Sequence, residues 1–103
     1  MRREEELREI ISFYGEKNQK NKAIEELGEL KQAVANDLAG HFDRANTVEE
    51  IADVLNMVDQ LIIVHGLDPF EIEKTRGFKN QRTLKRIETI KSREKAEWKG
   101  TEL

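Results

Sequence analysis

The stretch Lys22-Ala-Ile-Glu-Glu-Leu-Gly-Glu-Leu-Lys31 carries two patterns at once. Its apolar residues recur every three or four positions and continue to Val34, which is the spacing of an amphipathic helix. Its acidic residues include an E-x-x-E pair, Glu26 and Glu29. Paired carboxylates beside an apolar helical face predict a helical fold and an all-oxygen site for a hard divalent cation.

A second segment, Thr47-Val-Glu-Glu-Ile-Ala-Asp-Val-Leu55, repeats this arrangement with Glu50 and Asp53. Each residue of an α-helix advances by about 100°, so side chains can be assigned angles around the axis. With the first acid of each pair at zero, the second lies at about 300° and the apolar residues lie between about 20° and 100°. Two such helices packed antiparallel through their apolar faces bring the four carboxylates together, and their mutual repulsion favours a cation between them.

Four helices are expected along the chain. Apolar periodicity predicts one helix over about 3–14 and a second over about 18–38, with Gly15 ending the first. Thr47-Val-Glu-Glu50 matches a capping box, which predicts the start of a third helix that ends at Gly66. Asp68-Pro69 predicts the start of a fourth, which continues as a basic helical tail over about 86–103. The capping box also offers Glu50 a purely structural role that competes with metal binding.

The composition suits amphipathic helices. In a chain of 103 residues, 37% of the residues are hydrophobic and 38% are charged, which is little apolar material for a self-sufficient core. The expected fold is therefore all-α: an antiparallel bundle of about four helices in a single domain over residues 1–103, completed by oligomerisation as a homodimer or homotetramer.

The charge distribution and the residue usage limit the site chemistry, the location and the partners that the protein can have. Residues 1–70 hold 8 Lys and Arg against 15 Asp and Glu, a net charge of −7, whereas residues 71–103 hold 10 against 6, a net charge of +4. The chain has no cysteine, which excludes disulfides and thiolate metal sites. It also has no apolar run of about 18 residues. We expect a cytoplasmic protein without a membrane partner, and the acidic body disfavours nucleic acid as a partner of the basic tail.

Two motifs follow one another in a characteristic order: Gln19-x-x-Lys22-x-x-Glu25-Glu26-x-x-Glu29-Leu30 and, about twenty residues later, Glu49-Glu50-x-x-Asp53-Val54. In this respect the chain resembles the all-α nucleoside triphosphate pyrophosphohydrolases of the MazG-like superfamily. That group includes dimeric dUTPases and phosphoribosyl-ATP pyrophosphohydrolases. The resemblance covers about residues 10–86 and implies one MazG-like pyrophosphohydrolase domain.

The resemblance implies a Mg²⁺-dependent enzyme, with Mn²⁺ as a substitute. It would cleave a (d)NTP between the α and β phosphates to a monophosphate and pyrophosphate, as nucleotide-pool housekeeping. The implied metal ligands are Glu26, Glu29, Glu50 and Asp53. Glu25 and Glu29 are both candidates for the general base, and the sequence does not choose between them.

Six further residues are candidates for substrate binding. Lys22 precedes Glu26 by one helical turn and can reach a phosphate. Gln19 either contacts base or sugar or caps the second helix, and Asn56 either assists metal or ribose binding or is an ordinary polar position. By resemblance, a basic stretch after the metal helices supplies three phosphate ligands: Lys74, Lys79 and Arg82.

The sequence leaves two alternatives to a general (d)NTP pyrophosphohydrolase, one within the enzyme class and one outside it. Within the enzyme class, a phosphoribosyl-ATP pyrophosphohydrolase usually has Tyr-His after the E-x-x-D motif, where this chain has Asn56-Met57-Val58. A general (d)NTP pyrophosphohydrolase is therefore preferred. Outside it, a non-catalytic helical-bundle interaction protein would also have acidic amphipathic helices, but it leaves the matched carboxylates unexplained. The absence of a P-loop pattern argues against a Walker-type nucleotidase.

Overall fold

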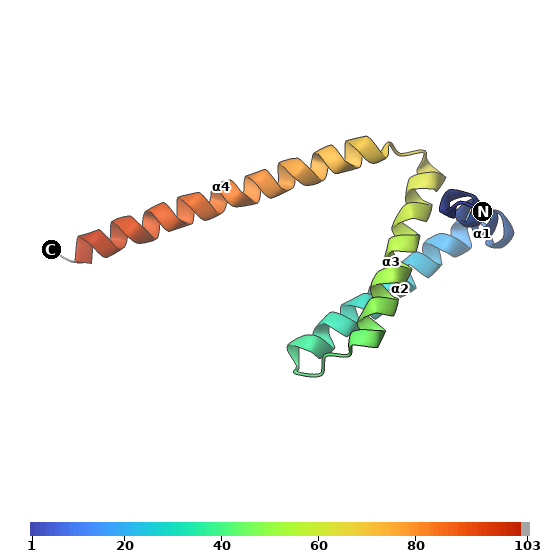
Figure 1. Ribbon diagram of the computed structural model, residues 1–103, viewed down its shortest axis with the longest axis horizontal. Helices are drawn as coiled ribbons and strands as arrows, with labels where there is room; N and C mark the ends of the chain where they lie inside the picture. The colour runs from blue at the N-terminus through green and yellow to red at the C-terminus, as the bar shows by residue number, and fades with distance from the viewer. Residues whose placement is uncertain (102–103) are drawn as a thin grey trace. The chain divides into compact units, whose positions relative to one another are not determined.

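All of the secondary structure described between Arg3 and Thr101 is α-helical (Figure 1). The computed structural model describes the backbone of residues 1–101 and the side chains of residues 1–97. It contains α1 (Arg3–Tyr14), α2 (Glu16–Leu38), α3 (Arg44–His65) and α4 (Pro69–Thr101). The predicted all-α class with four helices is confirmed. The chain divides into two compact units, Met1–Leu67 with α1 to α3 and Asp68–Leu103 with α4, and each is described by itself.

Three of the helix boundaries follow from local signals. Gly15 separates α1 from α2 with a φ of +89°, a conformation that glycine adopts without steric cost. Helix α2 begins directly at Glu16, two residues earlier than predicted. Gly66 ends α3 in the left-handed conformation, as predicted. The Asp68 carboxylate accepts a hydrogen bond from the backbone N–H of Phe70 (2.9 Å), which confirms the predicted start of α4.

The start of α3 differs from the prediction. The helix begins at Arg44, and Asp43 is its N-cap, with a carboxylate that accepts from the backbone N–H of Asn46 (3.1 Å). The Thr47 hydroxyl instead donates to the carbonyl of Asp43 (2.7 Å), a bond within the first turn. Thr47 therefore does not cap α3, and Glu50 lies well inside the helix rather than in a capping box.

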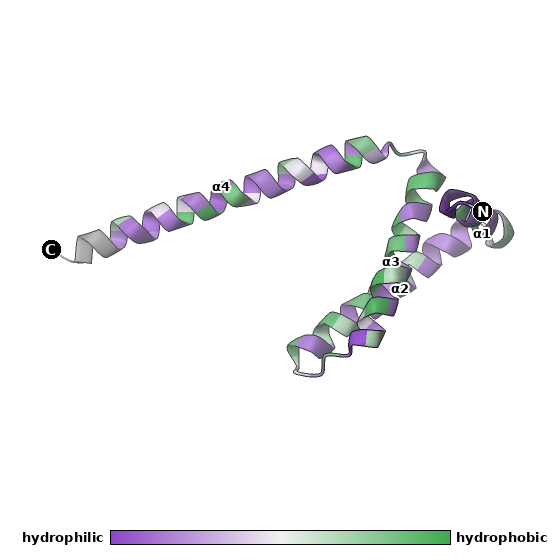
Figure 2. Cartoon of the chain, viewed as in Figure 1, coloured by the Kyte–Doolittle hydropathy of each residue, from purple (hydrophilic) through white to green (hydrophobic). Residues whose placement is uncertain are grey.

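In the first unit, α2 and α3 lie side by side as an antiparallel hairpin, and α1 packs against both (Figure 1). The buried apolar side chains among the described residues are Leu7, Ala23 and Ala33. Alanines at the seam let the two helices approach closely. Leu27 and Val34, expected at the same seam, are instead 52% and 53% exposed. Hydrophobic residues are frequent along both helices of the hairpin (Figure 2), and many of the large ones are exposed.

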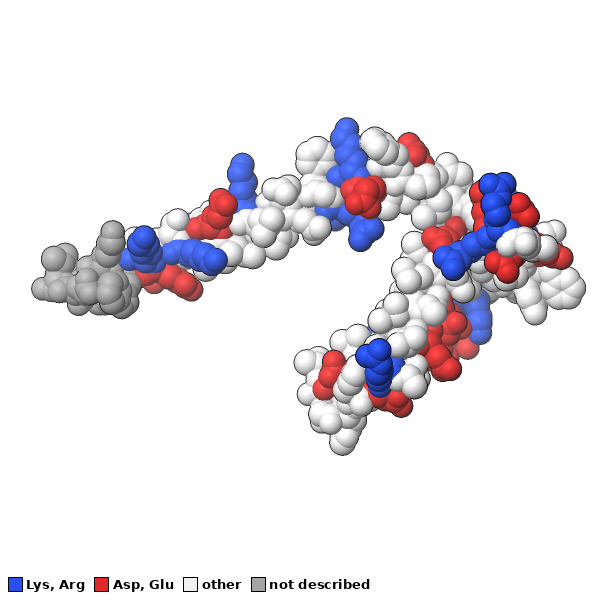
Figure 3. Space-filling view, viewed as in Figure 1, with Lys and Arg blue, Asp and Glu red and all other residues white. Residues whose placement is uncertain are grey.

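The second unit is the single long helix α4. Both basic and acidic side chains lie along it (Figure 3), and most of its large apolar residues are exposed, for example Phe78, Leu84 and Ile90. The predicted basic tail over 86–103 is helical to Thr101, and its last two residues lie outside the described part of the chain. None of the described helices has the length and apolar character needed to cross a membrane.

Candidate metal centre and adjoining pocket

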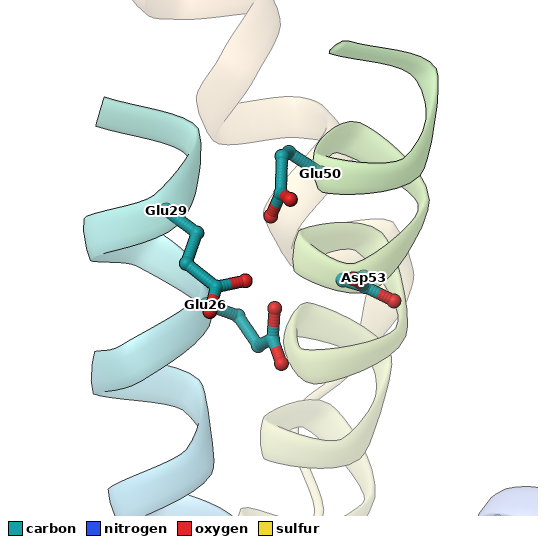
Figure 4. A group of neighbouring side chains, drawn as sticks. All are labelled: Glu26, Glu29, Glu50 and Asp53. Carbon is teal, nitrogen blue, oxygen red and sulfur yellow. The ribbon is translucent and has the colours of Figure 1, made fainter. Parts of the chain in front are cut away.

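Four carboxylates meet between α2 and α3. Glu26 and Glu29 come from one turn of α2, while Glu50 and Asp53 come from one turn of α3. One carboxylate oxygen from each residue lies within 4.8 Å of the others. Figure 4 shows Glu26, Glu29 and Glu50 reaching into the space between the two helices, with Asp53 beside them on α3. The side chains converge as the helical angles predict.

Two buried oxygens of this cluster have no hydrogen-bond partner among the described residues. Glu26 is only 5% exposed, and one of its oxygens forms an ion pair with Lys22 Nζ at 3.0 Å. Its second oxygen, Oε2, is buried without a hydrogen-bond donor, and the same holds for Oε2 of Glu50. A buried carboxylate oxygen without a partner is costly, because it has lost its water and gained nothing in exchange. A divalent cation between the helices would supply the missing partner for both.

The cluster also raises the pKa of Glu29, to about 7. The first cause is that the carboxyls of Glu50 and Glu26 lie where they can accept a hydrogen bond from protonated Glu29, and the second is that their charges repel its carboxylate. The pKa of Lys22 is raised by its hydrogen bond to Glu26 and by the nearby charge of Glu25. Without metal, Glu29 therefore holds a proton over part of the neutral pH range, and a cation must displace that proton to bind.

Beside the carboxylates lies a cavity of about 460 Å³, formed entirely within the first unit. Glu26 and Asp53 stand at its wall, so one space joins the acidic cluster to the rest of the pocket. The remaining lining residues are apolar side chains or carboxamides, together with one lysine: Leu7, Ile10, Tyr14, Asn18, Gln19, Lys22, Asn56, Met57 and Gln60. Four lining residues are apolar or aromatic and seven are polar or charged, so the pocket combines apolar contact surface with many hydrogen-bonding groups, as a site for a polar small molecule requires.

The structure places the predicted substrate residues unevenly. Gln19, Lys22 and Asn56 all line the pocket. Gln60, which sequence reasoning missed, lines it too and is 4% exposed. A signal for it existed, since Gln60 follows Asp53 by seven residues and so lies on the same face of α3. Three other candidates belong to the second unit and are exposed, and their role stays a prediction: Lys74, Lys79 and Arg82.

Glu25 is exposed and lies 3.9 Å from Lys22 through one carboxylate oxygen. It does not belong to the group of carboxylates that converge between the helices. Of the two general-base candidates, Glu29 is thus the one inside the cluster.

Residues 3–76 match the family model described as phosphoribosyl-ATP pyrophosphohydrolase. The chain belongs to this family. The match spans most of the chain and includes all four carboxylates and the pocket. It also places the chain in the MazG-like all-α superfamily that its two acidic motifs resemble. No curated protein and no solved structure matches the chain.

Membership of the family settles the broad chemistry. The protein is a pyrophosphohydrolase, an enzyme that hydrolyses a phosphoric anhydride and belongs to a family that depends on a divalent metal. The alternative of a non-catalytic helical interaction protein is therefore excluded. The substrate of the pyrophosphohydrolase belongs to the class of nucleotides.

Proposed function

We propose that this pyrophosphohydrolase uses Mg²⁺ to hydrolyse nucleoside triphosphates, ribo or deoxy, between the α and β phosphates. One observation carries the proposal: four carboxylates, two of them with an unpartnered buried oxygen, border a pocket of about 460 Å³. A nucleotide can then place its phosphates at the acidic end and its nucleoside in the pocket. The products are a nucleoside monophosphate and pyrophosphate.

The donor set fits a hard divalent cation. Glu26, Glu29, Glu50 and Asp53 offer only carboxylate oxygens, which Mg²⁺ and Mn²⁺ prefer. When bound, the cation supplies positive charge to the phosphate oxygens and lowers the pKa of the attacking water. The four carboxylates are thus the residues that would hold it, and the unpartnered oxygens of Glu26 and Glu50 would be satisfied.

The chain's own groups account for the remaining requirements. The ammonium of Lys22, next to Glu26, can bind an oxygen of the phosphate chain as a point charge. Glu29 is the better candidate for the general base, because it belongs to the carboxylate cluster, where the metal and the attacking water would lie. Glu25 is exposed outside the cluster and serves less well. Asn56 and Gln19 line the pocket where the ribose and base would lie.

Phosphoribosyl-ATP is the second candidate substrate, and the family match favours it. Against it stands Asn56-Met57-Val58 in the place where Tyr-His is expected after the E-x-x-D motif. Both candidates are nucleoside triphosphates with the same scissile bond, so the same acidic cluster would serve either. The choice between them depends on the nucleoside end of the pocket.

The test is pyrophosphate release from a panel of the common NTPs and dNTPs and from phosphoribosyl-ATP, with Mg²⁺ or with EDTA. At least one triphosphate should yield a monophosphate and pyrophosphate, and EDTA should abolish the reaction. The proposal fails if no triphosphate is turned over at high enzyme concentration. It also fails if the product is orthophosphate, which would place the cleavage between the β and γ phosphates.

We also propose that the protein assembles as a homodimer or homotetramer through the open face of the α2–α3 hairpin. Eight large apolar side chains of the hairpin are 41% to 87% exposed: Ile24, Leu27, Val34, Leu38, Val48, Ile51, Leu55 and Val58. A contiguous exposed apolar surface of this kind marks an interface, and the few buried apolar residues of one chain make a small core. A second copy presents the same face, so the contact can be isologous.

Placing a charge on this face should break the assembly. The Leu27→Glu variant should shift the protein from dimer or tetramer to monomer at micromolar concentration, because a carboxylate would be buried without a partner. Light scattering coupled to size-exclusion chromatography measures the mass. Ser12→Glu, at an exposed position of α1, is the matched control and should keep the wild-type mass. A monomeric wild-type protein with full helicity would contradict the proposal.

A further inference from the structure

The pocket ends in a pair of glutamines that bridges two helices. The Gln19 side-chain amide donates to the Gln60 side-chain carbonyl at 2.8 Å, joining α2 to α3. Gln60 is 4% exposed and is, with Glu26, one of the two buried polar residues among the described part of the chain. A buried side-chain amide is costly unless its polar groups are hydrogen-bonded. The burial of Gln60 therefore calls for a functional explanation.

The pair lies at a fixed separation from the carboxylates. Gln19 precedes Glu26 by seven residues on α2, and Gln60 follows Asp53 by seven residues on α3. At a rise of 1.5 Å per residue, each step is about 10 Å along the helix. Because α2 and α3 are antiparallel, both glutamines lie at the same end of the pocket, away from the acidic cluster.

The chemistry at this end suits a flat heterocycle. Leu7, Ile10, Tyr14 and Met57 supply apolar and aromatic walls. Among the described residues, no protein group bonds to the carbonyl oxygen of Gln19 or to the amide nitrogen of Gln60. The pair therefore presents one free acceptor beside free donors, and a nucleobase carries a complementary donor and acceptor along its pairing edge.

We propose that Gln19 and Gln60 bind the hydrogen-bonding edge of the substrate's nucleobase, with Gln60 also holding the Gln19 amide in place. The inference rests on the proposed function, which puts the phosphates at the carboxylates. A nucleotide carries its base on the far side of the ribose from its phosphates, so the base reaches the end of the pocket where the glutamines lie. Gln60 then contributes to recognition of the base and not to the chemistry of hydrolysis.

The test replaces Gln60 by methionine, which keeps the length of the side chain and removes the amide. The Gln60→Met variant should raise KM for the preferred NTP about tenfold while kcat changes little, because the bonds to the base form in the ground state and the transition state alike. With ribose 5-triphosphate, which lacks a base, the variant and the wild type should have the same KM.

A second variant separates positioning from contact. Gln60→Glu keeps an acceptor for the Gln19 amide but loses the donors to the base, so it should change the order of preference within the NTP panel. Gln32→Met is the control for the chemical change, since Gln32 is exposed and bonds to Asn36 (2.9 Å) outside the pocket. It should leave the KM values unchanged.

The outcomes are distinguishable from failure of the proposed function. If Gln60→Met lowers the activity on NTPs and on ribose 5-triphosphate equally, Gln60 has only a structural role and the inference is overturned. If the wild type hydrolyses no triphosphate, the proposed function fails, and titration with nucleoside monophosphates then tests the pocket. Tenfold weaker binding to Gln60→Met supports the inference, whereas equal binding overturns it.

Discussion

Replacing Glu26 by glutamine should reduce Mg²⁺-dependent pyrophosphate release by about 10³-fold or more, since loss of a metal ligand forfeits several kcal/mol of transition-state stabilisation. Glutamine has nearly the same shape but a neutral side chain. In the wild type, Glu26 is buried, one oxygen bonds to Lys22 and the other lacks a partner. An uncharged amide can still accept from Lys22, but it cannot supply the charge that a cation requires. The measurement is kcat/KM with the best substrate at saturating Mg²⁺.

The matched control is Glu16→Gln on the same helix. Glu16 is exposed, pairs with Lys20 (2.7 Å) and lies outside the carboxylate cluster, so its neutralisation should leave the activity within about twofold of the wild type. Far-UV circular dichroism should show the same helix content for both variants. A Glu26→Gln enzyme that keeps at least a tenth of the wild-type activity would show that the cluster is not the metal site.

Divalent-metal affinity should fall about 100-fold between pH 8 and pH 5. With a pKa of about 7, Glu29 is mostly deprotonated at pH 8 and mostly protonated at pH 5, so a proton competes with the metal more and more as the pH falls. An ordinary glutamate, with a pKa of about 4.3, would change the affinity only slightly above pH 5.5. Mn²⁺ titrations in matched buffers measure the effect. Glu29→Gln should bind more weakly overall but with a much flatter pH profile.

The same shift has a defined sign for stability. The pKa of Glu29 is raised in the folded chain, so the metal-free fold binds a proton more tightly than the unfolded chain does. That contribution is fully present below the unfolded pKa of about 4.5 and is lost as the pH rises through about 7. Added Mg²⁺ should therefore raise Tm more at pH 8 than at pH 5.5. An equal rise at both pH values, or an affinity that does not vary down to pH 5.5, would contradict this account.

The helices and the convergence of the carboxylates could be predicted because local rules decide them. Gly66 and Asp68-Pro69 are strong boundary signals, and the angle between residues three apart is nearly the same in every α-helix. The predicted start of α3 was wrong because two N-cap signals compete in this segment. Asp43 and Thr47 are both good N-cap residues, and the earlier one prevails since it extends the helix by another turn. This removes the structural role that competed with metal binding at Glu50.

Other features depend on contacts that a single sequence does not specify. Gln60 is buried because it meets Gln19 across the hairpin, a pairing that follows only once α2 and α3 are in register. Leu27 was expected between these helices, but the buried apolar residues of α2 are Ala23 and Ala33, and Leu27 is exposed. The roles of Lys74, Lys79 and Arg82 stay predictions, because these residues belong to the second unit and the carboxylates belong to the first.

The most direct test of the metal centre is calorimetric titration of Mg²⁺ and Mn²⁺ into the wild type and into Glu50→Gln. Glu50 is the sharpest choice, because its buried oxygen has no protein partner and it does not cap α3. The account predicts saturable binding of both cations to the wild type and at least tenfold weaker binding to the variant. Equal affinity for the two proteins, or no binding to the wild type at millimolar metal, would contradict it.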